Sequence, residues 1–501
     1  MRISVRRTAS VALMTALPAL ALAAPLPSAA EPRRGPSGAI PGQYIVTLDP
    51  GTAPIAVLEG LGVQPLFTYR HALSGFAARL TAGQVQRVRA APGVDEVEQD
   101  VMVTIPLGED APADSDLEPP PPVGVPGEPP GPVDFPQDMG TPDAPSADPA
   151  PPGEFPPHEP GPGQPLPEQA GPEEGVVALP PDAAPAGSPP SPGPGIKPVL
   201  PQGHPAASSG PPAVASGPAR AKGVRGLGGF TPWGLTRINN RALGGFGYSV
   251  RATGAKVTSY IVDSGIEFSH PDFGGRAVPG YDAIGDGLDG GDCNGHGTHV
   301  AGTVGGSYTG VARKTTLVSV RVFPCVGRTA NSAVIAGIDW VAGHAKRPAV
   351  ANLSFAGRWS LATNRAVEGL ARAGVFPVAA AGNENVNACF VSPASSQSAF
   401  TVGAIDQEDR RAWFSNWGTC VDIHAPGMGI LSAYLNGSFR DLDGTSMAAP
   451  HVTGIAVLYK DTHGDASFAT LSEWLTGHAI RNVPIDGGYG TARLSAFTNG
   501  L

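Results

Sequence analysis

Residues 260–266 read Y-I-V-D-S-G-I, an apolar run that ends on a carboxylate and a glycine. Apolar runs of this kind recur at 257–262, 317–322, 349–353, 375–380 and 400–404. Stretches that indicate helices alternate with them, at 298–304, 332–344, 364–373 and 446–459. This alternation predicts an α/β fold with a mostly parallel central sheet and helices on both faces. A functional site is expected beyond the carboxyl ends of the strands.

Asp263 and Ser446 stand where catalytic groups are expected, although each also has a structural explanation. Asp263 ends a buried strand, where a carboxylate is costly without a positive or donating partner, but it could cap the turn before Gly265. Ser446 lies in G-T-S-M-A-A-P-H-V (444–452) at an expected helix start, because Pro450 is accommodated only near such a start. A serine there either faces a cleft or simply caps the helix.

His296 lies in N-G-H-G-T-H-V-A-G-T (294–303), whose glycines allow other backbone to approach closely. His299 is three residues further on, so the two imidazoles could form a metal pair. The H-E-x-x-H pattern of zinc peptidases is absent from this stretch, and no third ligand stands nearby in the sequence. A catalytic histidine is therefore the preferred interpretation.

The chain order Asp263, His296, Ser446 is that of subtilisin. Over nearly all of 228–498 the chain resembles the subtilase family, most closely its proteinase K-like branch. The matching stretches are P-W-G-L-T-R-I (232–238), Y-I-V-D-S-G-I (260–266), N-G-H-G-T-H-V-A-G-T-V-G (294–305), A-A-G-N (380–383), S-P-A-S (392–395), D-R-R-A-W-F-S-N-W-G (409–418) and G-T-S-M-A-A-P-H-V (444–452). The resemblance implies a subtilisin-like three-layer fold and a serine endopeptidase.

The same resemblance implies catalytic roles. Ser446 would attack the peptide carbonyl, His296 would take the proton and return it to the leaving amine, and Asp263 would orient the imidazole. The Asn383 side chain and the Ser446 backbone N–H would stabilise the oxyanion. No cofactor is expected for this chemistry.

Substrate would lie extended between two segments, by resemblance. These segments consist of Gly327, Arg328, Thr329 and Ala330 on one side and Asn352, Leu353, Ser354, Phe355, Ala356 and Gly357 on the other. Backbone pairing of this kind tolerates many sequences, and small residues at 356–357 leave room for an apolar or aromatic side chain before the scissile bond. The family usually has Gly-Gly at 356–357 and a small residue at 328, so this chain departs from it at both places.

Four cysteines, Cys293, Cys325, Cys389 and Cys420, all lie in the C-terminal part. An even number in an exported chain indicates two disulfides with three possible connectivities, and four free thiols are the alternative. The lack of a C-x-x-C pair disfavours zinc. The family resemblance implies the sequential pairs Cys293–Cys325 and Cys389–Cys420.

A structural calcium site is also implied by the resemblance. Its ligands would be the Asp422 carboxylate and the backbone carbonyls of Gln397 and Ala399, since calcium prefers oxygen. The alternative is that Asp422 is simply solvated.

The N-terminal part predicts three further segments. Residues 1–30 are typical of a signal peptide, with arginines before an apolar stretch and small residues at 28–30, and the alternative is a membrane anchor. Residues 40–106 predict a small α+β module with a helix at 80–91 capped by Thr81. This module resembles the ferredoxin-like subtilase propeptide, an inhibitor and chaperone whose tail, here 97–105, enters the active site.

Residues 107–222 form a linker rich in proline, glycine and acidic residues. Of the 56 prolines, 36 fall between Pro106 and Pro218, and no Lys or Arg occurs between Arg89 and Lys197. Such a composition cannot bury enough apolar surface to fold, so disorder is expected. The peptidase domain is then predicted at 223–501.

These observations predict a secreted serine endopeptidase made as a zymogen. We expect protein and peptide substrates, the propeptide as inhibitor, a monomer, and no membrane contact after processing. The net charge of -10 and the lack of a basic patch disfavour nucleic acid. Three other functions compete: an inactive subtilase-like binding module, a structural surface protein built on the linker, and an esterase, which would need a G-x-S-x-G elbow with serine first.

Overall fold

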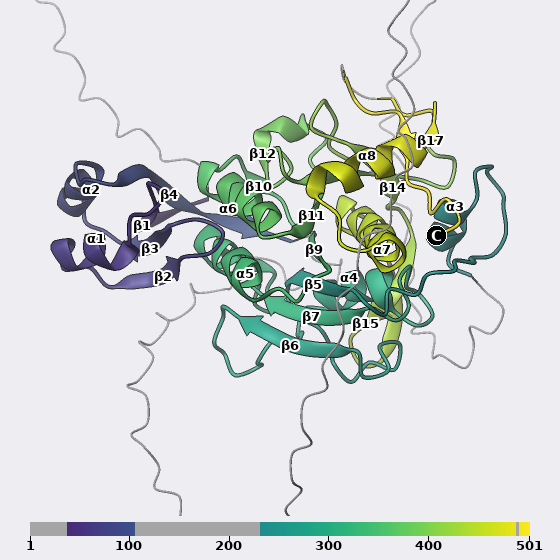
Figure 1. Ribbon diagram of the computed structural model, residues 1–501, viewed down its shortest axis with the longest axis horizontal. Helices are drawn as coiled ribbons and strands as arrows, with labels where there is room; N and C mark the ends of the chain where they lie inside the picture. The colour runs from purple at the N-terminus through teal and green to yellow at the C-terminus, as the bar shows by residue number, and fades with distance from the viewer. Residues whose placement is uncertain (1–37, 106–230, 487–489) are drawn as a thin grey trace, which may run out of the picture. The chain divides into compact units, whose positions relative to one another are not determined.

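The computed structural model describes residues 38–105, 231–486 and 490–501, which belong to one compact unit (Figure 1). The predicted signal peptide at 1–30 and the predicted linker at 107–222 lie outside the described residues. No helix in these three described ranges combines the length and the apolarity needed to cross a bilayer.

The N-terminal module is an antiparallel sheet with two helices. Its elements are β1 (Ala39–Leu48), α1 (Pro54–Leu61), β2 (Pro65–Tyr69), β3 (Gly75–Arg79), α2 (Ala82–Arg89) and β4 (Val94–Thr104), with strand order β2-β3-β1-β4. Thr81 caps α2 as predicted, because its side chain accepts from Gln84 N and the Gln84 side chain accepts from Thr81 N. The module therefore has the α+β class that the sequence predicts.

The C-terminal part is built on a nine-stranded sheet of order β17-β18-β14-β13-β11-β9-β5-β7-β6. Its strands are β5 (Thr258–Asp263), β6 (Ala277–Asp282), β7 (Thr316–Arg321), β9 (Ala349–Leu353), β11 (Val375–Ala380), β13 (Phe400–Ile405), β14 (Ile423–Pro426), β17 (Ile480–Arg481) and β18 (Leu494–Ser495). Every pairing is parallel except that of β17 with β18. The predicted mostly parallel sheet is confirmed.

Helices cover both faces of this sheet, because successive apolar side chains along β9 point to opposite faces. Ala349, Ala351 and Leu353 join a core cluster with α5 (Asn331–His344) and α6 (Leu361–Arg372). Val350 points the other way, into a cluster with α7 (Thr445–His463) and α8 (Phe468–His478). The remaining helices are α3 (Trp233–Asn239) and α4 (His296–Gly305), so the described fold has the three layers expected.

Shorter elements surround the sheet. They are β8 (Arg328–Ala330), β10 (Gly357–Arg358), η2 (Ala388–Phe390), β12 (Val391–Ser392), and the hairpin of β15 (Ile430–Tyr434) and β16 (Ser438–Leu442). The five predicted central strands and the four predicted helices are present, with ends shifted by up to four residues. The sequence analysis did not predict β6, whose A-V-P-G-Y-D lacks an apolar run and is only partly buried.

Candidate active site

Asp263 and His296 form a buried pair at the carboxyl end of β5. Asp263 is fully buried, and its Oδ1 accepts from His296 Nδ1 at 2.8 Å and from Ser264 N at 2.7 Å. These donors meet the carboxylate that burial would otherwise destabilise. The turn-capping explanation and the catalytic one therefore both find support here, because one oxygen serves the local turn and the imidazole together.

His296 is held by the close approach of α4 to the turn after β5. A Cβ added at Gly297 would lie 2.2 Å from Gly265 O, so only glycine permits this packing. Gly297 N donates to Ser264 Oγ at 2.9 Å, and Ser264 Oγ donates to Asp292 Oδ1. The first turn of α4 is thus fixed directly against the strand that carries Asp263.

His299 does not form a metal pair with His296. Its Nε2 donates to the carbonyls of Ile430 and Arg440, at 2.8 and 3.0 Å, which ties α4 to the β15–β16 hairpin. Burial, and secondly the charge of His296, lowers the pKa of His299 to about 3, so it stays neutral. The residues that the structure describes contain no cluster of three or more histidine, cysteine or carboxylate ligands.

Ser446 is the second residue of α7, and its carbonyl is freed by Pro450. Proline has no N–H to donate to the carbonyl four residues earlier, and Ser354 Oγ donates to Ser446 O instead, at 2.8 Å. Pro450 therefore lies one turn deeper in the helix than the expected position at its unpaired start. The Ser446 hydroxyl donates to Ser354 O at 3.1 Å, while His296 Nε2 has no hydrogen-bond partner among the described residues. The Ser446 hydroxyl is thus hydrogen-bonded to Ser354 O and not to His296.

Asn383 is oriented by Thr445, the residue before Ser446. The Asn383 Oδ1 atom accepts from Thr445 N at 2.9 Å and from Thr445 Oγ1 at 2.8 Å. This leaves Nδ2 as a donor on the other side. A Cβ added at Gly444 would lie 3.6 Å from both Asn383 Nδ2 and Ser446 N, so the two donors flank one small space.

The two predicted substrate segments are brought together by β4 of the module. β4 pairs antiparallel with β8, with Val103 opposite Thr329 and Thr104 opposite Arg328. On its other side Thr104 bridges to Ala356, and Ile105 N donates to Gly327 O at 3.0 Å. The tail of the module thus lies extended between the segments. Four further residues of the second segment are buried: Asn352, Leu353, Ser354 and Phe355. Gly357 follows Ala356 as the first residue of β10.

Carboxylates at helix N-termini form contacts between the N-terminal module and the C-terminal part, and the sequence analysis missed these contacts. Glu98 accepts from Leu361 N and Ala362 N, both at 2.9 Å, at the start of α6. Asp100 accepts from Ser332 N at 3.2 Å at the start of α5. Asp339 of α5 in return accepts from three backbone N–H groups of the module, those of residues 70–72. Acidic residues near expected helix starts are too common in sequences to have revealed this.

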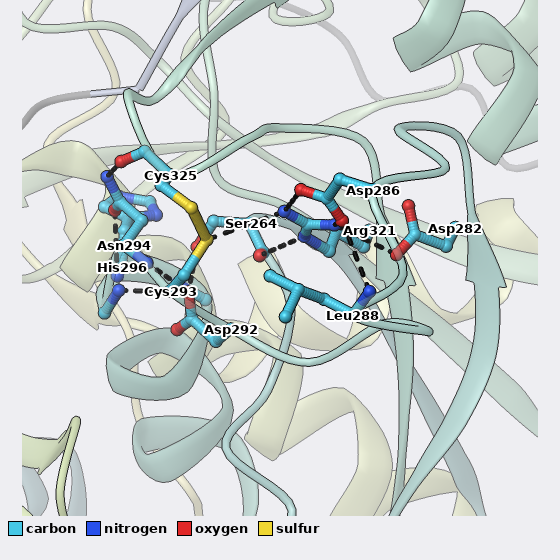
Figure 2. Close-up of a disulfide and its surroundings, with 12 residues drawn as sticks. Ser264, Asp282, Asp286, Leu288, Asp292, Cys293, Asn294, His296, Arg321 and Cys325 are labelled. Carbon is cyan, nitrogen blue, oxygen red and sulfur yellow. Dashed lines mark hydrogen bonds and ion pairs between the residues drawn. A yellow bond between two sulfur atoms is a disulfide. The ribbon is translucent and has the colours of Figure 1, made fainter. Parts of the chain in front are cut away.

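Both disulfides implied by the family resemblance are confirmed, Cys293–Cys325 and Cys389–Cys420. The first joins the loop before His296 to the loop before Gly327, and Asn294 Nδ2 also donates to Cys325 O. Figure 2 shows this bridge beside Arg321, which the sequence analysis did not single out. It thereby ties the loop before His296 to one of the two predicted substrate segments.

Asp422 is a largely buried carboxylate bonded to a backbone N–H. Its Oδ2 accepts from Thr401 N at 2.7 Å, and burial raises its pKa to about 6. No positive side chain is among the described groups that set this value. The donor set of Asp422 with the carbonyls of Gln397 and Ala399 fits calcium, which takes oxygen ligands. Bound calcium would there supply structural charge only.

Comparison with known proteins identifies both parts of the chain. Residues 254–495 match the Subtilase family, and residues 61–106 match Peptidase inhibitor I9. A solved structure described as a cold adapted subtilisin-like serine proteinase is 44% identical, with TM-score 0.52, over 54% of this chain and 98% of that chain. The chain belongs to the subtilase family.

Curated subtilase relatives are similar over part of their length. The "Alkaline serine exoprotease A" of Vibrio alginolyticus is 49% identical over 47% of this chain and 44% of its own length. The "Extracellular serine proteinase" of Thermus sp. (strain Rt41A) is 48% identical over 53% of this chain and 66% of its own. The chain thus spans about half to two thirds of the relatives it matches.

Proposed function

We propose that this subtilase is a secreted serine endopeptidase, made as a zymogen, with Asp263, His296 and Ser446 as its triad and broad specificity. The observation that carries the proposal is the 2.8 Å bond between the buried Asp263 carboxylate and His296 Nδ1, while the other imidazole nitrogen has no partner within the described part of the chain. An imidazole whose Nδ1–H is donated to a carboxylate has a basic Nε2, which is the form that accepts a proton from serine.

The chemistry follows from these positions. Ser446 Oγ leaves Ser354 O, gives its proton to His296 Nε2 and attacks the peptide carbonyl. Asp263 keeps the imidazole in the required tautomer and stabilises its positive charge. Asn383 Nδ2 and Ser446 N, which flank one space, donate to the oxyanion. His296 then protonates the leaving amine, and water hydrolyses the acyl-enzyme.

Protein and peptide substrates would bind where β4 lies. The pairing of Thr104 with both Arg328 and Ala356 supports extended binding between the two segments, with selection of apolar or aromatic side chains before the scissile bond. The same pairing supports an inhibitory role for the module, because its tail excludes substrate from the cleft. Secretion is supported by the two disulfides, which persist in oxidising compartments.

A structural calcium at Asp422, Gln397 and Ala399 completes the proposal, while catalysis itself uses only the side chains above. We further propose that the matured protein acts as a monomer without nucleic acid or membrane.

Ser446→Ala in the full chain tests the proposal. The variant loses the nucleophile but little volume, so it should fold and accumulate as an uncut precursor, whereas the wild type should mature and cleave peptides. The wild type should also react with a serine-directed covalent inhibitor, and the variant should not. An inactive binding module would be indicated if the wild type cleaved no peptide. Maturation of purified Ser446→Ala at the wild-type rate would mean either that another serine is the nucleophile or that maturation is not self-catalysed.

A further inference from the structure

We propose that Arg328 and Arg358 select substrates that carry acidic side chains at two alternate positions of the bound strand. The inference rests on the proposed function and names a substrate class for the same cleft. It starts from the pairing of β4 with its neighbours and concerns the face of the bound strand that is turned away from the core.

Thr104 fixes the first position. It lies opposite Arg328 in the antiparallel pairing of β4 with β8 and bridges to Ala356 on its other side. Residues directly opposite in such a pair have Cβ atoms about 4.5–5.5 Å apart and point to the same face. A substrate side chain at the Thr104 position therefore lies beside the Arg328 stem.

Met102 fixes the second position. The bridge of Thr104 to Ala356 is antiparallel, so a substrate strand continued in that register would bring the residue at the Met102 position opposite Arg358, whereas in this chain Met102 N donates to Gly38 O at 2.8 Å. A Cβ added at Gly357 would lie 3.2 Å from Val103 Cγ2, as this register requires. Alternate residues of a strand share a face, so Met102 and Thr104 point the same way. The two arginines thus border one face of the bound strand from opposite edges.

Burial shows that Met102 and Thr104 lie on the outer face of the bound strand. Val103 is 4% exposed and Ile105 0%, and both pack in one core cluster with Phe355. Thr104 is exposed and Met102 is partly buried. The inner face is therefore selected by apolar fit, and the outer face lies between the strand positions that carry Arg328 and Arg358.

Guanidinium groups favour carboxylates, which they bind with paired hydrogen bonds. The chain's own tail places neutral side chains, Met102 and Thr104, at both positions. A substrate with Asp or Glu there would gain ion pairs that these two side chains cannot make. The sequence between Arg89 and Lys197, with 20 acidic residues and no basic one, has this chemistry.

The test uses the matured product of the full chain and quenched fluorescent peptides based on residues 100–105. One peptide pair has Asp or Asn at the Thr104 position, and a second pair has Asp or Asn at the Met102 position. At low salt we expect kcat/KM to be about 2–5-fold higher for Asp than for Asn at each position, as for partly exposed ion pairs. The ratio should approach one in about 1 M salt.

Each arginine serves as the control for the other. Arg328→Gln should abolish the Asp preference at the Thr104 position and keep it at the Met102 position, and Arg358→Gln should do the reverse. Arg372→Gln, which removes an exposed charge at the end of α6, should change neither ratio. Because each ratio uses the Asn peptide as reference, a general loss of rate in a variant does not affect it.

Equal rates for the Asp and Asn peptides in the wild type would overturn this inference and leave the proposed function intact. An Asp preference that survives in both arginine variants would overturn the assignment to these residues. Failure of the wild type to cleave any of the four peptides would contradict the proposed function itself, and the inference with it.

Discussion

The two disulfides close loops of nearly equal length, with separations of 32 and 31 residues, but their surroundings are charged differently. Beside Cys293–Cys325, fully buried Arg321 pairs with Asp282 Oδ2 at 3.0 Å and Asp286 Oδ1 at 2.5 Å (Figure 2). Beside Cys389–Cys420, the Asp422 carboxylate meets a backbone N–H of Thr401 and no cation among the described groups that set its pKa.

This difference shows that a disulfide does not determine whether the carboxylates beside it have a partner of opposite charge. Around the first bridge Arg321 gives both Asp282 and Asp286 a cationic partner from the chain itself. Around the second bridge burial raises the pKa of Asp422, which means that the charged form of this carboxylate is disfavoured. The predictions below are best measured in the Ser446→Ala background, so that self-cleavage does not interfere.

The largest effect of a single substitution is expected at Arg321, beside the first bridge. Arg321→Met should lower the free energy of unfolding by about 3 kcal/mol, because it leaves two carboxylates near the bridge without their cation. Denaturant unfolding measures this. Arg410→Met, which removes an exposed guanidinium paired with Asp406 and Glu408, is the matched control and should have no measurable effect. An equally small effect at Arg321 would show that the region is not held by its charges.

Removal of either disulfide should lower the free energy of unfolding by a similar amount. The two removals should differ in their effects on peptide cleavage and on the response to calcium. Paired Cys→Ser changes should each lower stability by up to about 3–4 kcal/mol, since the loops are equally long in the chain-entropy model. With Ser446 intact, loss of Cys293–Cys325 should also reduce peptide cleavage, because that bridge precedes both His296 and Gly327. Loss of Cys389–Cys420 should instead weaken the response to calcium. An identical activity loss in both variants would contradict the distinction.

Asp422→Asn should abolish the calcium response of the second region. A chelator should lower the melting temperature of the parent chain, and added calcium should restore it. The variant should melt at the same temperature with chelator and with calcium, because the amide offers no charge to the ion. If chelator leaves the parent unchanged, the proposed calcium site does not exist.

The smallest effect is a pH dependence of the same site. The pKa of Asp422 is raised from 3.8 to about 6 in the folded chain, so without a cation its contribution to stability is present below about pH 4 and lost as pH rises through 6. Calcium binds the charged form, so the calcium-induced rise in melting temperature should be full at pH 7.5 and fade between pH 6 and 5. A rise that is constant from pH 8 to 4.5 would assign it to another site.

Apolar runs and motif spacing predicted the central sheet because β9, β11 and β13 are buried on both faces and read as continuous apolar stretches. Strands at the edge of the sheet were not predicted, because they lack such a continuous apolar stretch. β6 contains Pro279 and is only partly buried, and β18 has two residues, so neither has an apolar run that could be recognised. The predicted site residues Asp263 and His296 do meet, whereas the hydrogen bond of Ser446 to Ser354 O was not foreseen.

The sequence by itself determined the parallel sheet, the module, the family and the identity of the triad candidates, since these follow from local pattern and from motifs of fixed spacing. Only the tertiary structure decided which groups each charged side chain lies beside. Arg321 meets Asp282 and Asp286, Glu98 meets the start of α6, and Arg328 borders Thr104 across distances of 35 to more than 250 residues in the chain. Such partners are set by how strands and helices pack, because electrostatic contact depends on distance in space and leaves no periodic trace in the sequence.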